Sequence, residues 1–306
     1  MAVYRRTYNQ YEGPLTREHW RFTVLPRYSL KTAFESRLLT SFFSFCFFPH
    51  ILALFIIYVR NNDLLVEYLK FNAPGVLAAV DINGEFFYYL FAAQTFLSFF
   101  VIVFVGPGLV SPDLANNALP LYLSRPFTRT EYVVGKIAVL FTLTSLITWV
   151  PGLLLVGVQA DLAGLSWLWD NPRIPIGIVV GSLFWTLTVS LISLALSAWV
   201  KAKPIATASL FGVFFASGAF GQAVNAVLDL NPRWGDLLNL PATMRGLWNW
   251  LLLNEATFGQ TVIRSRTGRF LTEGIPAWSG FLVLLAVCAI SIFLLARKIR
   301  AVEVAR

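Results

Sequence analysis

The stretch PIGIVVGSLFWTLTVSLISLALSAWVKAKPIATASLFGVFFASGAFGQAVNAVL, residues 175–228, decides the fold class of this chain. It holds two long apolar runs, 175–200 and 205–228, with only the basic connection 201–204 between them. A helix that crosses a membrane needs about twenty predominantly apolar residues, and both runs are long enough. The connection is so short that we expect a helical hairpin with its tip at one membrane face.

Four more runs of this kind occur along the chain. The 306 residues are 57% hydrophobic and only 13% charged, which is far from the composition of a soluble domain. The runs are continuous rather than alternating, which argues against a transmembrane β-barrel. We therefore predict an all-α polytopic membrane protein, with a cytoplasmic segment 1–37, a transmembrane domain 38–296 and a cytoplasmic basic tail 297–306. The predicted spans are 38–59, 86–110, 133–158, 175–200, 205–228 and 277–296.

The distribution of positive charge predicts the orientation. Of the 24 Lys and Arg residues, 16 lie in the segment before the first span, in the second connection counted through Lys136, in the fourth connection and in the C-terminal tail. Because cytoplasmic loops carry the excess of Lys and Arg, both termini are expected in the cytoplasm. The net charge of +8 then reflects topology rather than nucleic-acid binding. The predicted outer loops contain no N-x-[ST] sequon, which fits a bacterial inner membrane.

The connection between the second and third spans reads GPGLVSPDLANNALPLYLSRPFTRTEYVVGK, residues 106–136. Gly106-Pro107-Gly108 predicts a break in the preceding helix. Ser111 is then expected to cap a new short helix with Pro112 in its first turn. Thr128 followed three residues later by Glu131 fits a capping box, so the next span should begin near Arg129.

This loop resembles the first cytoplasmic loop of type 2 ATP-binding-cassette exporter permeases. The resemblance rests on GPGLV at 106–110, ALPLYLSRP at 118–126 and RTEY at 129–132. The segments 11–13 and 297–303 also look like the family, while the rest matches only in hydropathy. In that family the loop forms a coupling helix that docks on a separate ATPase subunit. The resemblance assigns this contact to Asp113, Leu121, Tyr122, Ser124, Arg125 and Arg129.

From the residues alone, the loop could equally be an ordinary basic inner loop. The same choice exists at 25–37, where Leu30, Phe34 and Leu38 lie at helical spacing against a basic face that includes Arg37. This pattern favours an interfacial helix over a plain charged flank. In the resembled family an elbow helix precedes the first span and forms part of the surface that faces the ATPase.

Small residues recur in the fifth span. Ala208, Gly212 and Ala216 are spaced by four, which predicts a helix-packing face whose partner lies in this chain or in a second copy. The long connection that follows is rich in tryptophan. Trp248 and Trp250 favour a helix at the outer surface or one that re-enters shallowly, either as a gate or as a loop resting on the membrane. Trp149 is expected near an outer end.

Missing motifs limit the function classes. The predicted spans contain no Asp or Glu, which ion-coupled transporters normally need as relays. The chain has no G-x-x-x-x-G-K-[ST] motif, so it has no P-loop of its own, and its two His and two Cys residues suggest no metal site. We expect a non-enzymatic permease subunit that binds no cofactor, works as a homo- or heterodimer, and depends on a partner ATPase carrying ATP and Mg²⁺. The alternatives are a membrane scaffold or assembly factor that recruits a cytoplasmic partner, and an uncoupled channel.

Overall fold

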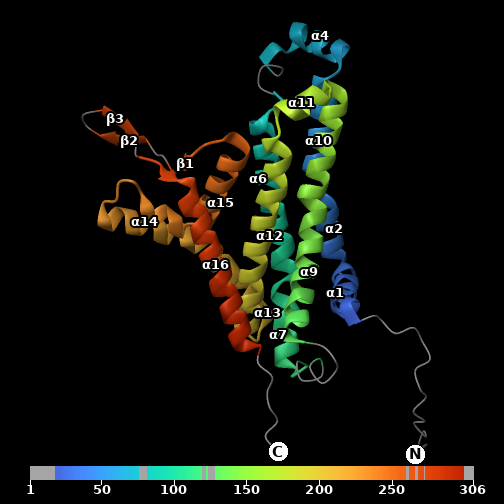
Figure 1. Cartoon of the computed structure of the whole chain (residues 1–306), viewed down its shortest axis with the longest axis vertical. Helices are drawn as coiled ribbons and strands as arrows, with labels where there is room; N and C mark the ends of the chain where they lie inside the picture. Colours follow the sequence, from blue (N-terminus) through green and yellow to red (C-terminus); the bar gives the residue numbers. More distant parts are fainter. Residues whose placement is uncertain are drawn as a thin grey trace, which may run out of the picture.

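The computed structural model describes residues 18–75, 81–118, 122, 128–259, 262–265, 268–271 and 273–299. Within these residues six helices are long and apolar enough to cross a membrane. Each of them overlaps one predicted span, so the prediction of a helical multi-pass membrane protein is confirmed (Figure 1). The six helices are Arg37–Arg60, Gly84–Ala115, Arg129–Ala163, Arg173–Trp199, Lys203–Leu228 and Ala277–Lys298.

Most of these long helices are divided by a local break or a change of helix type. The elements in chain order are η1 (Glu18–Thr23), α1 (Val24–Phe34), α2 (Arg37–Phe45), α3 (Phe48–Arg60), α4 (Asp63–Asn72), α6 (Gly84–Val105), α7 (Pro107–Ala115), α9 (Arg129–Ile147), α10 (Trp149–Ala163), α11 (Leu165–Asp170), α12 (Arg173–Trp199), α13 (Lys203–Phe211), η2 (Gly212–Ala216), α14 (Ser217–Leu228), η3 (Trp234–Leu238), α15 (Leu240–Trp248), η4 (Asn249–Leu253), β1 (Thr257–Phe258), β2 (Val262–Ser265), β3 (Gly268–Leu271), β4 (Ile275–Pro276) and α16 (Ala277–Lys298).

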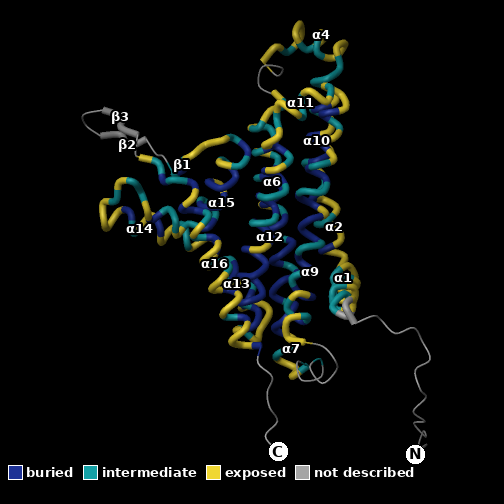
Figure 2. Tube along the Cα trace, viewed as in Figure 1, coloured by how far each residue is buried: buried dark blue, intermediate teal, exposed yellow. Residues whose placement is uncertain are grey.

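Helix α12 is the centre of the bundle, in contact with α6, α7, α9, α10, α13 and α16. Figure 2 shows its buried residues where it passes between α9 and α16. Small polar residues make part of this packing: the Trp185 indole N–H donates to Ser98 Oγ at 2.7 Å, and the Thr144 and Thr186 hydroxyls lie 3.1 Å apart. Interhelical hydrogen bonds of this kind are a usual source of helix association in a membrane.

The third span is longer than the predicted 133–158. Its 35 residues, α9 and α10, would extend about 52 Å at 1.5 Å per residue, whereas a hydrocarbon core is about 30 Å thick. The helix is broken at Thr148, where φ is −115° and ψ is −93°. Trp149 is the first residue of α10, just after this break, and its place near an outer membrane end stays a prediction. The upper end of α10 in Figure 1 projects with α4 and α11.

The fifth span bends away from the bundle. A π-helical segment, η2, joins α13 to α14, and α14 points outward in Figure 1. The chain then returns as η3, which packs on α14 through a close contact of Gly221 with Gly235. Asn225 holds this return, since its Oδ1 accepts from Gly235 N at 2.7 Å and its Nδ2 donates to Asp236 Oδ1 at 2.9 Å.

Helix α15 runs from this return back into the bundle. Trp248, at its end, is only 4% exposed, and its ring centroid lies 5.1 Å from that of Phe91 and 5.6 Å from that of Trp185. Trp248 is thus covered by aromatic partners from α6 and α12, and the depth of this helix in the membrane stays a prediction. Trp250 is 46% exposed. Two short antiparallel pairs, β1 with β4 and β2 with β3, complete this connection and were not predicted.

Candidate functional site

The loop 106–136 begins at the junction of α6 and α7. Gly106 is helical, with φ −57° and ψ −50°, so α7 continues α6 almost without interruption and the predicted break is wrong. A side chain at this position would collide with Ser193 Oγ of α12 and with Ile102 O. The glycine therefore serves a close approach between helices, a role that is independent of helix breaking.

Because α7 already begins at Pro107, Ser111 lies inside the helix and its prediction as a cap is wrong. It is instead buried against the tip of the α12–α13 hairpin. Its N–H donates to Ser197 Oγ at 2.9 Å, and its hydroxyl donates to Lys201 O at 3.2 Å. Ser197 Oγ in turn donates to Pro107 O at 2.8 Å. With the bond from Val110 N to Ser197 Oγ at 3.3 Å, four hydrogen bonds fix α7 to the hairpin tip.

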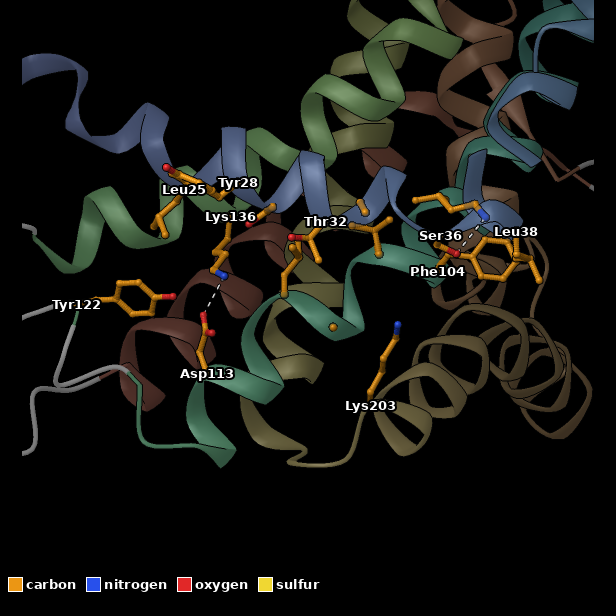
Figure 3. A pocket seen from close by; sticks show the side chains of 16 residues that line it. Leu25, Tyr28, Thr32, Ser36, Leu38, Phe104, Asp113, Tyr122, Lys136 and Lys203 are labelled. Carbon is orange, nitrogen blue, oxygen red and sulfur yellow. Dashed lines mark hydrogen bonds and ion pairs between the residues drawn. The ribbon is translucent and has the colours of Figure 1, made fainter. Parts of the chain in front are cut away.

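A buried ion pair joins α7 to α9. Lys136 Nζ lies 2.8 Å from Asp113 Oδ2, with side chains only 6% and 17% exposed, respectively (Figure 3). The Tyr132 hydroxyl donates to the same carboxylate oxygen at 2.7 Å. The ammonium also lies 5.3 Å from the centre of the Tyr132 ring. The Asp113–Lys136–Tyr132 cluster thus neutralises two charges that would be costly to bury singly.

The start of α9 is built as predicted. The Thr128 side chain accepts from Glu131 N at 3.2 Å, and Thr128 N donates to Glu131 Oε2 at 2.6 Å, so the capping box and the start at Arg129 are confirmed. Both ends of the connection 116–128 are therefore anchored: one by the ion pair, the other by the cap. The two ends of this connection are thus attached to two long helices.

The six residues assigned to this loop by resemblance occupy different environments. Asp113 uses its carboxylate within the chain, and the Tyr122 ring centroid lies 5.8 Å from that of Tyr132. Burial, and then the negative charge of Asp113, raise the pKa of the Tyr122 phenol. Arg129 is the first residue of α9 and is exposed. Leu121, Ser124 and Arg125 lie outside the described residues.

The sequence analysis missed the partners of Asp113. Lys136 falls inside the predicted span 133–158, where an ionisable side chain is functional by default, but it was counted with the loop cations. Its spacing of four residues from Tyr132 places both on one face of α9. That spacing and the apolar surroundings of Lys136 were the signals that pointed to a buried partner.

Helix α1 lies along α9. A Cβ placed on Gly135 would be 3.3 Å from Leu25 Cβ and 3.3 Å from Phe22 O, so the glycine allows α1 to come this close. Leu30 packs partly buried on the core, and the Phe34 ring centroid lies 5.3 Å from that of Phe43. The chain therefore has a separate helix before its first span.

This helix ends at Phe34, earlier than expected. Ser36 caps a new helix, α2, by accepting from Leu39 N at 3.4 Å, and Arg37 is the first residue of α2. Leu38 consequently lies on a different helix from Leu30, so the predicted single apolar face over 25–37 is wrong. The cause is the cap, because an extended residue at Ser36 changes the chain direction.

A cavity of about 450 Å³ separates α1 from α7 and α13 (Figure 3). Hydroxyl-bearing residues of α1 and the α1–α2 junction line one side, and the Asp113–Lys136 pair and Lys203 line the other. Its apolar wall comes from α2 and from the end of α6. The hydroxyl side consists of Tyr28, Ser29, Thr32 and Ser36, and the apolar wall includes Leu38, Leu39, Phe104, Val105 and Leu109.

The small-residue face of the fifth span has no partner within the described chain. Ala208, Gly212 and Ala216 are all exposed, and no described atom beyond the helix itself lies within 4 Å of a Cβ placed on Gly212. Leu210 and Phe214 face the bundle instead. The sequence left open whether this face packs on another helix of the chain or on a second copy. The described residues contain no such helix.

No model of a known protein family matches the chain, and no curated protein matches it either. Among the described residues, no group of three or more His, Cys, Asp or Glu side chains is arranged to hold a metal ion.

Proposed function

We propose that this chain is the permease subunit of an ATP-binding-cassette exporter, paired with a second permease copy and driven by a separate ATPase subunit. One observation carries the proposal: the loop with the family-like sequence is mechanically anchored at both ends. Asp113 and Ser111 tie α7 to α9 and α12, and the Thr128 cap starts α9 at the other end. A force on the loop would therefore reach three long helices.

In this proposal the coupling helix lies within 107–127, and α1 is the elbow helix. Figure 1 draws α1, α7, the start of α13 and the end of α16 toward the same end of the bundle. This end also carries the cations of 27–37, 129, 201–203 and 297–298, as expected for a cytoplasmic face. The chain would then lie in a bacterial inner membrane with both termini cytoplasmic.

The mechanism follows from the anchoring. ATP binding closes the two ATPase subunits, and the connection 116–128 moves with them. Helices α7 and α9 then tilt together relative to α12, between two states. The Asp113–Lys136 pair holds α7 and α9 in a fixed relative position. Without it, α7 could move without moving α9. Arg125 and Arg129 make the contact with the ATPase.

Co-purification tests this assignment. The ATPase encoded beside this gene is expected to purify with the full chain and to be lost from the double variant R125E/R129E. Lys70, exposed on α4 at the opposite end of the bundle, supplies the matched control K70E, which should retain the complex. Equal complex formation by all three proteins, with the permease folded, would contradict the docking residues.

ATP hydrolysis in the reconstituted complex separates transport from scaffolding. An exporter is expected to hydrolyse ATP faster when its substrate is present. A complex that assembles normally yet responds to no exported compound would support the scaffold alternative.

A further inference from the structure

The cavity between α1 and α7 contains a cation that has no partner. Lys203 lies at the first position of α13 and points into the cavity (Figure 3). No acidic side chain forms an ion pair with it among the described residues. A lysine at the positive end of a helix is electrostatically unfavourable, and the first turn of α13 carries no acidic residue to offset it. This corner of the cavity therefore favours an anion.

The opposite side of the cavity can donate hydrogen bonds. Ser29 and Thr32 make no side-chain hydrogen bond with any described residue, and both line the space. Lys136 is nearly buried and has three ammonium donors, while Asp113 is the acceptor found for it. The charges of Lys136 and Asp113 cancel, so Lys203 leaves the lining with one net positive charge. Cations and hydroxyl donors together suit a phosphate group.

The shape of the cavity points to a lipid rather than a soluble phosphate. Gly108 lines the floor of the cavity and leaves space there because it has no side chain. A Cβ at this position would lie 3.4 Å from Lys203 Cδ and Cε. Beyond Lys203 the wall becomes apolar, with Phe104 and the 62%-exposed Leu38 (Figure 3). A molecule with a phosphate at Lys203 would thus place an attached acyl chain along an apolar helix surface. Basic pockets between helices near a membrane surface bind anionic lipid head groups in this way.

We propose that the cavity between α1, α7, α9 and α13 binds the phosphate head group of an anionic phospholipid, with Lys203 as its main charged contact. The site does not depend on the transport proposal, because its ligand comes from the bilayer. The bound lipid would join α1 to the α12–α13 hairpin through Ser29, Thr32 and Lys203.

Native mass spectrometry of the full chain, titrated with phosphatidylglycerol or phosphatidylcholine, tests the site. Wild-type protein should bind phosphatidylglycerol more tightly than phosphatidylcholine. K203Q should weaken phosphatidylglycerol binding about 5-fold, which corresponds to about 1 kcal/mol. The matched control is K201Q, since Lys201 is an exposed cation two residues away that does not line the cavity. It should bind like the wild type.

A second variant tests the space itself. G108L fills the floor of the cavity and should abolish the preference for phosphatidylglycerol, whereas G157L, at an open helix position with nothing within 4 Å, should preserve it. If G108L does not fold, the comparison of K203Q with K201Q decides alone.

Four results would overturn the proposal. K203Q binding as well as wild type, or K201Q losing as much as K203Q, would reduce the preference to diffuse surface attraction. Equal binding of phosphatidylcholine would remove the anion requirement. Displacement of phosphatidylglycerol by a similar concentration of sn-glycerol 3-phosphate would identify a soluble phosphate as the ligand.

Discussion

Helix α12 and the fifth span are neighbours in the sequence, yet they use similar apolar composition in opposite ways. Of the most apolar window in α12, 72% is buried within the chain, compared with 22% in the fifth span. Ser197 of α12 donates to Pro107 O of α7, whereas the small residues Ala208, Gly212 and Ala216 of the fifth span face outward. Hydropathy alone therefore cannot tell whether a helix is surrounded by protein or by lipid, because both surroundings are apolar.

The largest loss of stability is expected at the buried Asp113–Lys136 ion pair. D113A removes the partner of Lys136 and should destabilise the protein by about 3–5 kcal/mol, because an uncompensated ammonium stays buried. The double variant D113A/K136M should recover much of this loss. Thermal unfolding of the purified protein in detergent measures both. A double variant no more stable than D113A would show that the pair has another role.

Close packing beside α12 should give the next largest effect. G106A pushes a methyl group into Ser193 of α12 and is expected to cost about 1–3 kcal/mol. Its matched control is G157A, where nothing lies within 4 Å of the new Cβ. The same unfolding measurement compares them, and equal stability of the two variants would mean that α7 and α12 can separate at no cost.

A smaller effect is expected from the hydrogen bonds at the hairpin tip. S197A removes the acceptor of Ser111 N and the donor to Pro107 O, and should cost about 1–2 kcal/mol. S209A is the control, because the Ser209 hydroxyl donates to Ile205 O of its own helix and forms no hydrogen bond with another element in the described part of the chain. Hydrogen exchange at α7 gives a local readout. Unchanged protection in S197A would contradict the anchoring of α7.

The exposed region should show the smallest change in stability. G212L adds a side chain where the described structure leaves space, so the unfolding temperature should shift little. A206L, at a fully buried position of the same span, is the destabilising comparison. If a second copy packs on the small-residue face, G212L should reduce dimer formation in cross-linking while the monomer stays folded. A dimer unaffected by G212L would place the interface elsewhere.

The sequence by itself determined the number, order and approximate limits of the spans, because crossing a membrane demands a fixed length of apolar chain. It also determined the start of α9, since a capping box uses only Thr128 and Glu131, three residues apart. Local rules failed wherever a distant segment supplied the partner. Gly106 and Ser111 looked like a helix break and a cap, but α12 and the hairpin tip use them for packing and hydrogen bonding.

Tertiary structure alone decided which polar and aromatic side chains meet. The pairing of Asp113 with Lys136, the burial of Trp248 between α6 and α12, and the outward small-residue face of the fifth span all depend on contacts between segments far apart in the chain. The cavity beside Lys203 has the same origin, since residues of α1, α2, α6, α7, α9 and α13 line it. Apolar periodicity cannot specify such contacts, because in a membrane every face of a helix meets an apolar neighbour.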